Sequence, residues 1–117
     1  MTTGNVPIKK EIKKIRTSLG CSQEMLKVII GVGVRTVARW EHEESHPHQL
    51  VLEKIRKIEK LVKKIEEVFE TKDAVEWLKT PNQSFGGRTP LKEIAYNDDG
   101  IETVINLLGA IERGIVT

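Results

Sequence analysis

Six apolar residues between positions 49 and 69 recur at alternating steps of four and three residues. They are Val51, Ile55, Ile58, Val62, Ile65 and Phe69, with Leu61 and Val68 beside the same row. This spacing puts them on one stripe of an α-helix and excludes a strand, in which successive side chains point to opposite faces. A helix of this length spans about 30 Å and can join two small domains. Its stripe fits three roles: a dimer contact, a rigid connector, or a face packed against both flanking parts of the chain.

Three shorter helices are predicted before the long one. The first ends at Gly20, and its apolar stripe is Ile8, Ile12, Ile15 and Leu19. Ser22 is a good N-cap for the second helix, and Gly31 supplies the left-handed residue that ends it. The third runs from about residue 34 to residue 43. Because the rest of the chain also has helical spacing, the fold class is predicted to be all-α.

The second and third helices are joined by the letters GVG, which predicts a helix-turn-helix motif. In that motif the second helix of the pair enters the major groove of DNA. On the third helix, Val37 and Trp40 share one side and are expected to face the core. Arg35, Arg39 and His42 share the opposite side. Arginine suits that side, because its planar fork can donate to guanine or clamp a phosphate.

Charge is distributed unevenly along the chain. Residues 1–64 hold 14 Lys and Arg against 7 acidic residues, whereas residues 65–117 hold 5 against 10. The net charges are therefore +7 and −5, which add to the +2 of the whole chain. A basic half favours a polyanion such as DNA, while an acidic half would be repelled by DNA and is expected to serve another partner. Chance clustering on solvated helix faces is the simpler alternative.

The cellular setting follows from what the sequence lacks. Cys21 is the only cysteine, which excludes an internal disulfide or a cysteine zinc cluster and fits a reducing compartment. The longest apolar run is far too short to span a bilayer, and the N-terminus has no signal-peptide pattern. We therefore expect a cytoplasmic protein that does not bind membranes. Three histidines fall between positions 42 and 48, namely His42, His46 and His48, and their spacing favours a solvated linker over a metal site.

The stretch WLKTPNQSFGGRTPLKEI, residues 77–94, is expected to be a turn-rich frame between short helices. The letters FGG need unusual backbone angles, and Thr89-Pro90 is a cap and first residue for a further helix. Asp99 and Glu102 are spaced for a capping box at the start of the last helix, and Gly114 is expected to end it. An apolar end, residues 115–117, remains beyond it; chain ends of this kind usually fray, but a partner could bind it.

The letters LGCSQEMLKVIIGVGVRTVARWE resemble the DNA-binding core of the phage-repressor-like Xre family. The resemblance implies that Gln23 contacts a backbone phosphate. It also implies that Val34, Arg35 and Arg39 face base edges, with Thr36 near the DNA backbone. Four positions depart from the family pattern, and two of them, Met25 and Val28, are apolar where charges are common. Lys27 stands where a small alanine usually packs, and Gly33 replaces the usual serine cap.

The segment from about residue 68 to residue 117 resembles the toxin-binding domain of Xre, MbcA and ParS antitoxins. The matching letters include WL, TPN, GG and TPL between positions 77 and 91, and the spacing of Gly100, Leu108 and Gly114. Such antitoxins neutralise RES-class toxins, which resemble ADP-ribosyltransferases and consume or transfer from NAD. In that family the C-terminal end of the antitoxin plugs the NAD pocket of the toxin. The resemblance therefore implies toxin contacts from Ile111, Arg113, Gly114, Ile115, Val116 and Thr117.

An enzyme is not expected, because no nucleophile, base and orienting group can be assembled and the FGG glycines lack the spacing of a phosphate loop. No cofactor or metal is expected either. The sequence instead predicts a helix-turn-helix domain over residues 1–47, a connecting helix over 48–69 and a toxin-binding domain over 70–117. Its expected partners are a RES-type toxin, operator DNA and a second copy of the chain. The alternative is a stand-alone transcription regulator whose C-terminal module senses another ligand or protein.

Overall fold

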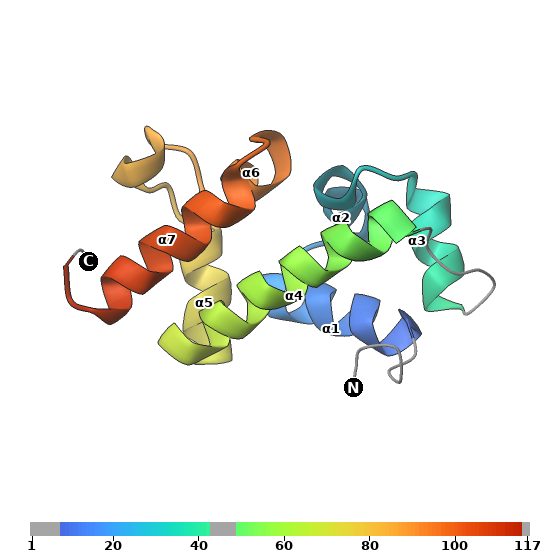
Figure 1. Cartoon of the computed structure of the whole chain (residues 1–117), viewed down its shortest axis with the longest axis horizontal. Helices are drawn as coiled ribbons and strands as arrows, with labels where there is room; N and C mark the ends of the chain where they lie inside the picture. The colour runs from blue at the N-terminus through green and yellow to red at the C-terminus, as the bar shows by residue number, and fades with distance from the viewer. Residues whose placement is uncertain (1–7, 43–48, 116–117) are drawn as a thin grey trace.

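The computed structural model describes residues 8–42 and 49–115, and this part of the chain is helical throughout, with no strand. The all-α prediction is therefore confirmed. Seven α-helices and one short 3-10 turn follow one another along these residues (Figure 1): α1 (Ile8–Leu19), α2 (Gln23–Ile30), α3 (Val34–Glu41), α4 (Gln49–Val68), α5 (Thr71–Leu78), η2 (Gln83–Phe85), α6 (Pro90–Tyr96) and α7 (Gly100–Glu112). Over the same ranges, no helix combines the length and the apolar content that a membrane crossing would need.

Helices α1 and α2 end at the glycines that the sequence predicted, and α2 and α3 begin where it predicted. Gly20 follows α1 with φ 64°, and Gly31 ends α2 with φ 86°, both in the left-handed region that favours glycine. The Ser22 hydroxyl accepts a hydrogen bond from the Met25 amide at 3.1 Å, which confirms it as the N-cap of α2. The third helix ends at Glu41, two residues earlier than predicted.

The long helix α4 crosses the whole molecule diagonally in Figure 1, from the neighbourhood of α3 to that of α5 and α7. Ile55, Ile58 and Val62 are buried in a hydrophobic core that α1 and α2 share with α5, α6 and α7. Of the three roles considered for the stripe, packing against both parts of the chain is the one observed between Ile55 and Ile65. This stretch is therefore covered by the chain itself and is closed to a second copy.

The last three helices form a compact unit around α7. Thr89 caps α6 by accepting a hydrogen bond from the Lys92 amide at 3.1 Å, with Pro90 in the first turn, as predicted. Gly86 and Gly87 have φ 64° and 88°, which confirms that FGG needs unusual backbone angles. The predicted capping box of α7 is wrong. Asp99 stands at the N-cap position, but its ψ of 12° is not extended and its carboxylate makes no cap hydrogen bond.

The two halves of the molecule also touch directly, through α1 with α5 and α2 with α6. At the first contact, a Cβ added to Gly20 would lie 2.6 Å from Cγ1 of Val75. Within the C-terminal unit, a Cβ on Gly100 would lie 1.9 Å from the Glu93 carbonyl oxygen, so α6 and α7 meet backbone to backbone. Glycine is required at both positions because no side chain fits between the elements.

Candidate DNA-binding and partner-binding surfaces

A buried carboxylate at the end of α3 fixes the helix-turn-helix in place. Glu41 is 5% exposed, and both of its oxygens accept hydrogen bonds from Nη1 of Arg16 on α1, at 3.0 and 2.8 Å. Oε1 also accepts from Nε2 of Gln23 at the start of α2, at 2.9 Å. A buried carboxylate is stable only when its oxygens are satisfied in this way. The three side chains therefore hold α1, α2 and α3 in one fixed arrangement.

The residues predicted to contact DNA lie on α2 and α3 in this arrangement. Gln23 is half-buried and donates to Glu41, so its amide nitrogen already has an internal role that the sequence did not indicate. Thr36 is half-buried, whereas Arg39 is exposed, as is His42 just beyond α3. Val37 is fully buried, as predicted for the core side of this helix.

Several of the predicted positions fall outside what the structure describes. Val34 and Arg35 lie in α3, but their side chains are not among those described, and the same holds for Trp40. His46 and His48 also lie outside the described residues. Their proposed roles remain predictions from the sequence.

Two of the departures from the family pattern, Lys27 and Gly33, are accommodated without strain. Lys27 points partly into solvent, with its side chain 42% exposed and its Nζ 3.6 Å from Glu24. Gly33 precedes α3, and its carbonyl accepts from the amides of Thr36 and Val37. A Cβ on Gly33 would meet nothing within 4 Å, so its lack of a side chain is not required by packing.

Helix α7 ends at a left-handed glycine, just before Ile115. Gly114 has φ 77°, its amide donates to the Ile111 carbonyl, and the Ile115 amide donates to the Ala110 carbonyl, both at 2.9 Å. This pair of bonds is the Schellman arrangement that stops a helix. Ile115 is 66% exposed, and Arg113 is exposed beside it, while Ile111 is half-buried. Val116 and Thr117 lie outside the described residues.

An ion pair ties the last turn of α7 to α4. Nζ of Lys64 lies 2.6 Å from Oε1 of Glu112 and 3.5 Å from Glu67. The hydrogen bond to Glu112 is the main reason that the pKa of Lys64 is raised above its ordinary value. The pair joins residues 48 positions apart in sequence, and it holds the last turn of α7 against α4.

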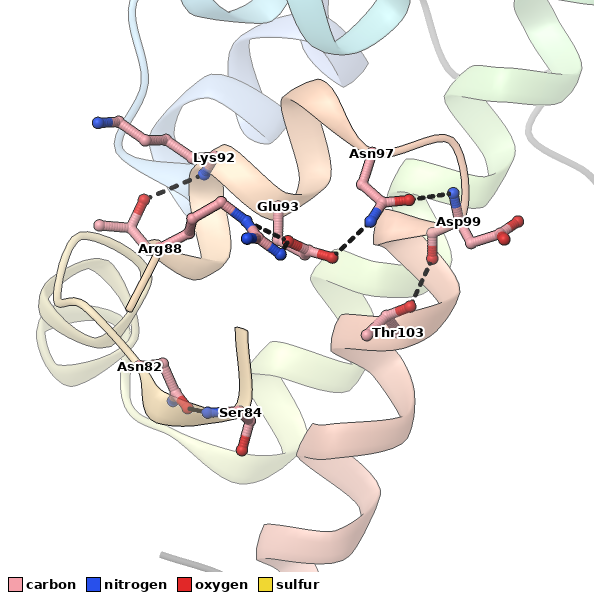
Figure 2. Close-up of polar contacts among 9 residues, drawn as sticks. Asn82, Ser84, Arg88, Lys92, Glu93, Asn97, Asp99 and Thr103 are labelled. Carbon is pink, nitrogen blue, oxygen red and sulfur yellow. Dashed lines mark hydrogen bonds and ion pairs between the residues drawn. The ribbon is translucent and has the colours of Figure 1, made fainter. Parts of the chain in front are cut away.

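A second buried carboxylate, which sequence reasoning missed, organises residues 82–99 (Figure 2). Glu93 is 3% exposed; its Oε1 accepts from Nε and Nη2 of Arg88 at 3.0 and 2.8 Å, and its Oε2 accepts from Nδ2 of Asn97 at 2.8 Å. The Asn97 side-chain oxygen in turn accepts from the Asp99 amide at 3.0 Å. The only sequence signal was the i, i+4 spacing of Glu93 and Asn97 on one helix, which is too common to identify a network.

Comparison with known proteins gave three findings. Residues 65–114 match the family described as the antitoxin Xre/MbcA/ParS C-terminal toxin-binding domain, and residues 12–58 match a helix-turn-helix family. Among solved structures, the chain resembles one in the crystal structure of the M. tuberculosis MbcT–MbcA toxin–antitoxin complex. That likeness has a TM-score of 0.73 and 23% identity over 97% of this chain and 99% of the other, and at this identity it shows a shared fold. The curated protein sequences gave no match.

Proposed function

Residues 65–114 belong to the Xre/MbcA/ParS family of antitoxin toxin-binding domains, and from this premise we propose that the chain is an antitoxin that neutralises a RES-type toxin. We propose further that it represses its own operon through the helix-turn-helix at residues 12–58. The observation that carries the first proposal is the end of α7. A rigid helix stop projects an exposed isoleucine from the domain whose family binds toxins.

The apolar end of the chain, residues 115–117, is here called the tail, and it is suited to binding in a pocket of a partner protein. Ile115 is an aliphatic residue left largely in solvent, and burial of such a side chain is worth roughly 1.5 to 3 kcal/mol. Its backbone is already fixed by the bond to Ala110, so little conformational entropy is lost on docking. Arg113 lies beside it and would supply a charged contact at the mouth of the NAD pocket of the toxin.

The test is growth rescue of cells that express the neighbouring toxin gene together with this chain. We expect removal of residues 114–117, or the single change Ile115→Asp, to abolish rescue while the thermal melt stays near that of the full chain. Leu50→Asp is the matched control, because Leu50 is also an exposed aliphatic residue, 79% exposed on α4. Full rescue by Ile115→Asp would show that neutralisation does not depend on the tail.

Repression requires that the exposed side of α3 reach DNA. One recognition helix reads few base pairs, so we propose that a homodimer binds a palindromic operator upstream of its own gene. Arg35→Ala and Arg39→Ala should each weaken operator binding by about 1 to 3 kcal/mol if they contact bases. Titration of promoter fragments measures this, with Lys57→Ala on α4 as the control. Unchanged operator affinity in both arginine variants would show that neither arginine contributes to recognition of the DNA sequence.

A further inference from the structure

The loop of residues 82–88, here called the glycine loop, is held rigidly although much of its surface is open to solvent. The Asn82 amide donates to the Arg88 carbonyl, and the Gly87 amide donates to the Asn82 carbonyl, both at 3.0 Å. The Asn82 side chain also accepts from the Ser84 amide at 2.8 Å. Phe85 is 2% exposed and anchors the loop in the core. The hydrogen bond between Asn82 and Arg88 therefore closes the two ends of the loop, and the buried Phe85 side chain holds its middle against the core.

Arg88 is the charged side chain that this loop presents. Nε and Nη2 of Arg88 both donate to the buried Glu93, yet the Arg88 side chain is 56% exposed. Figure 2 shows the guanidinium lying along Glu93, with Asn97 on the far oxygen of the carboxylate. Nη1 takes part in neither bond to Glu93. The buried carboxylate thus fixes the guanidinium in one orientation, while the two N–H groups of Nη1 make no bond to Glu93.

The glycines keep the approach to Nη1 open. A Cβ on Gly86 would lie 3.5 Å from Nη1 of Arg88, in ordinary contact, so a side chain at this position would stand beside the guanidinium. A Cβ on Gly87 would meet nothing within 4 Å. A pre-oriented guanidinium at an uncovered surface recognises a carboxylate at low entropic cost.

The position of the glycine loop in the molecule favours a toxin over DNA as the partner that it contacts. Figure 1 puts residues 82–88 and the end of α7 at the end of the molecule away from α3, so DNA bound at α3 would be remote from both. The loop also lies inside residues 65–114, the range of the toxin-binding family, whereas Ile115 lies just beyond that range. A toxin contact at the glycine loop would therefore fall inside the matched domain.

We propose that the glycine loop is a second contact surface for the toxin, in which Arg88, held by Glu93, donates to a carboxylate side chain of the toxin. The inference rests on the proposed antitoxin function. It assigns Arg88 a role in specificity: the tail fills a pocket, and the guanidinium selects the partner that has an acidic group at the matching place. Arginine is enriched among the residues that dominate such interfaces.

The test compares the affinity of variants for the purified product of the neighbouring toxin gene by titration calorimetry. Arg88→Lys keeps the positive charge but loses the planar guanidinium and its fixed N–H donors. This change should weaken toxin binding by 10-fold or more. Gly86→Asn tolerates the left-handed backbone and covers Nη1, and it should have a similar effect. Gly31→Asn is the matched control, since Gly31 has φ 86° and open space around it but lies on the DNA-binding half. It should leave toxin affinity unchanged.

Melting midpoints separate a lost contact from a damaged fold, because Gly86→Asn and Gly31→Asn should lower stability by similar amounts. Wild-type affinity in both Arg88→Lys and Gly86→Asn would overturn the inference while leaving the antitoxin function intact. A full chain that does not bind the toxin would overturn both. An effect of Arg88→Lys on operator binding, with toxin binding unchanged, would also overturn it.

Discussion

At the scale of single residues, neighbours decide what a given amino acid contributes. Gly20 and Gly31 have similar left-handed backbones, with φ 64° and 86°, and both follow a helix. A Cβ on Gly31 would be in open space, whereas a Cβ on Gly20 would collide with Val75 across the junction of α1 and α5. Gly31 is therefore required only by its backbone conformation, and Gly20 also by the packing of the two halves.

Gly20→Ala should consequently destabilise the chain more than Gly31→Ala. The backbone cost of a left-handed alanine, about 1 to 2 kcal/mol, is common to both variants. The collision at Gly20 should add about 1 to 3 kcal/mol. Urea unfolding followed by circular dichroism measures the difference, and Val75→Ala in the Gly20→Ala background should recover part of the loss. Equal losses in the two single variants would contradict the close contact.

Glu11 on α1 gives the chain a pH-dependent stability. It lines a groove with Glu59 of α4, and its pKa is raised from 4.5 to about 7 by partial burial first, then by a hydrogen bond and repulsion from Glu59, while Arg56 opposes the shift. Lys10 and Lys14 of α1, and Lys63 and Glu66 of α4, line the same groove. Between pH 4.5 and 7 the folded chain holds a proton that the unfolded chain releases, so this stabilisation is lost as pH rises through that window.

Glu11→Gln should reduce the fall in unfolding free energy that occurs as the pH rises from 4.5 to about 7. The effect should be about 1 kcal/mol or less, because Glu11 is only partly buried and the water that reaches it screens the interaction. Melting temperatures measured at half-unit steps of pH provide the test. Glu53→Gln, an exposed carboxylate on α4, should leave the wild-type curve unchanged. Parallel curves for wild type and Glu11→Gln would show that the carboxyl pair does not titrate in this range.

At the scale of elements, α4 is the structural centre of the molecule and not a free spacer. It contacts α1 and α2 on one side and α5 and α7 on the other. Ile58, near its middle, is fully buried, while Leu50 in its first turn is 79% exposed. The same helix therefore offers two aliphatic positions with opposite environments.

Ile58→Ala should cost about 2 to 5 kcal/mol of unfolding free energy, as expected for a buried aliphatic truncation. Leu50→Ala should change it by less than about 0.5 kcal/mol. Because α4 packs against both halves, operator binding and toxin binding should be lost at the same lowered melting temperature in Ile58→Ala. Loss of one activity well below the other would show that α4 supports only one half.

At the scale of the whole molecule, the proposed DNA-binding surface and the proposed toxin-binding surface belong to helices that share one hydrophobic core. That core joins residues of α1 and α2, such as Leu19 and Leu26, to residues of the last helices, such as Leu78 and Leu108. The chain measures 43 × 28 × 25 Å, with α3 and the end of α7 toward opposite ends in Figure 1. A toxin at one end and DNA at the other can thus be bound by a single folded unit.

A fragment of residues 1–69 should not fold on its own. It keeps the helix-turn-helix but exposes Leu61, Val62 and Ile65 of α4, which the complete chain buries. We expect the fragment to lack a cooperative thermal transition and to lose operator binding, whereas removal of residues 114–117 should preserve both. The measurement is calorimetry with operator titration. A cooperative melt and full operator affinity in the fragment would establish two independent domains.

The sequence alone determined the helices of this protein, because a helix depends on local spacing and on its end residues. The four-three spacing predicted α4, and Ser22, Gly31 and Gly114 marked helix ends that the structure confirms. Residue letters also carried the resemblance to both families. These signals need no knowledge of what lies across the molecule.

Tertiary structure decided the contacts between residues that are distant in sequence. Arg16 meets Glu41, Lys64 meets Glu112, and Gly20 faces Val75 only after the helices pack. The cap of α7 was mispredicted for a related reason, since the backbone at Asp99 is set by the tight junction of Gly100 with α6. Spacing along a chain fixes which side of a helix a residue occupies, but the free energy of packing selects which other element covers that side.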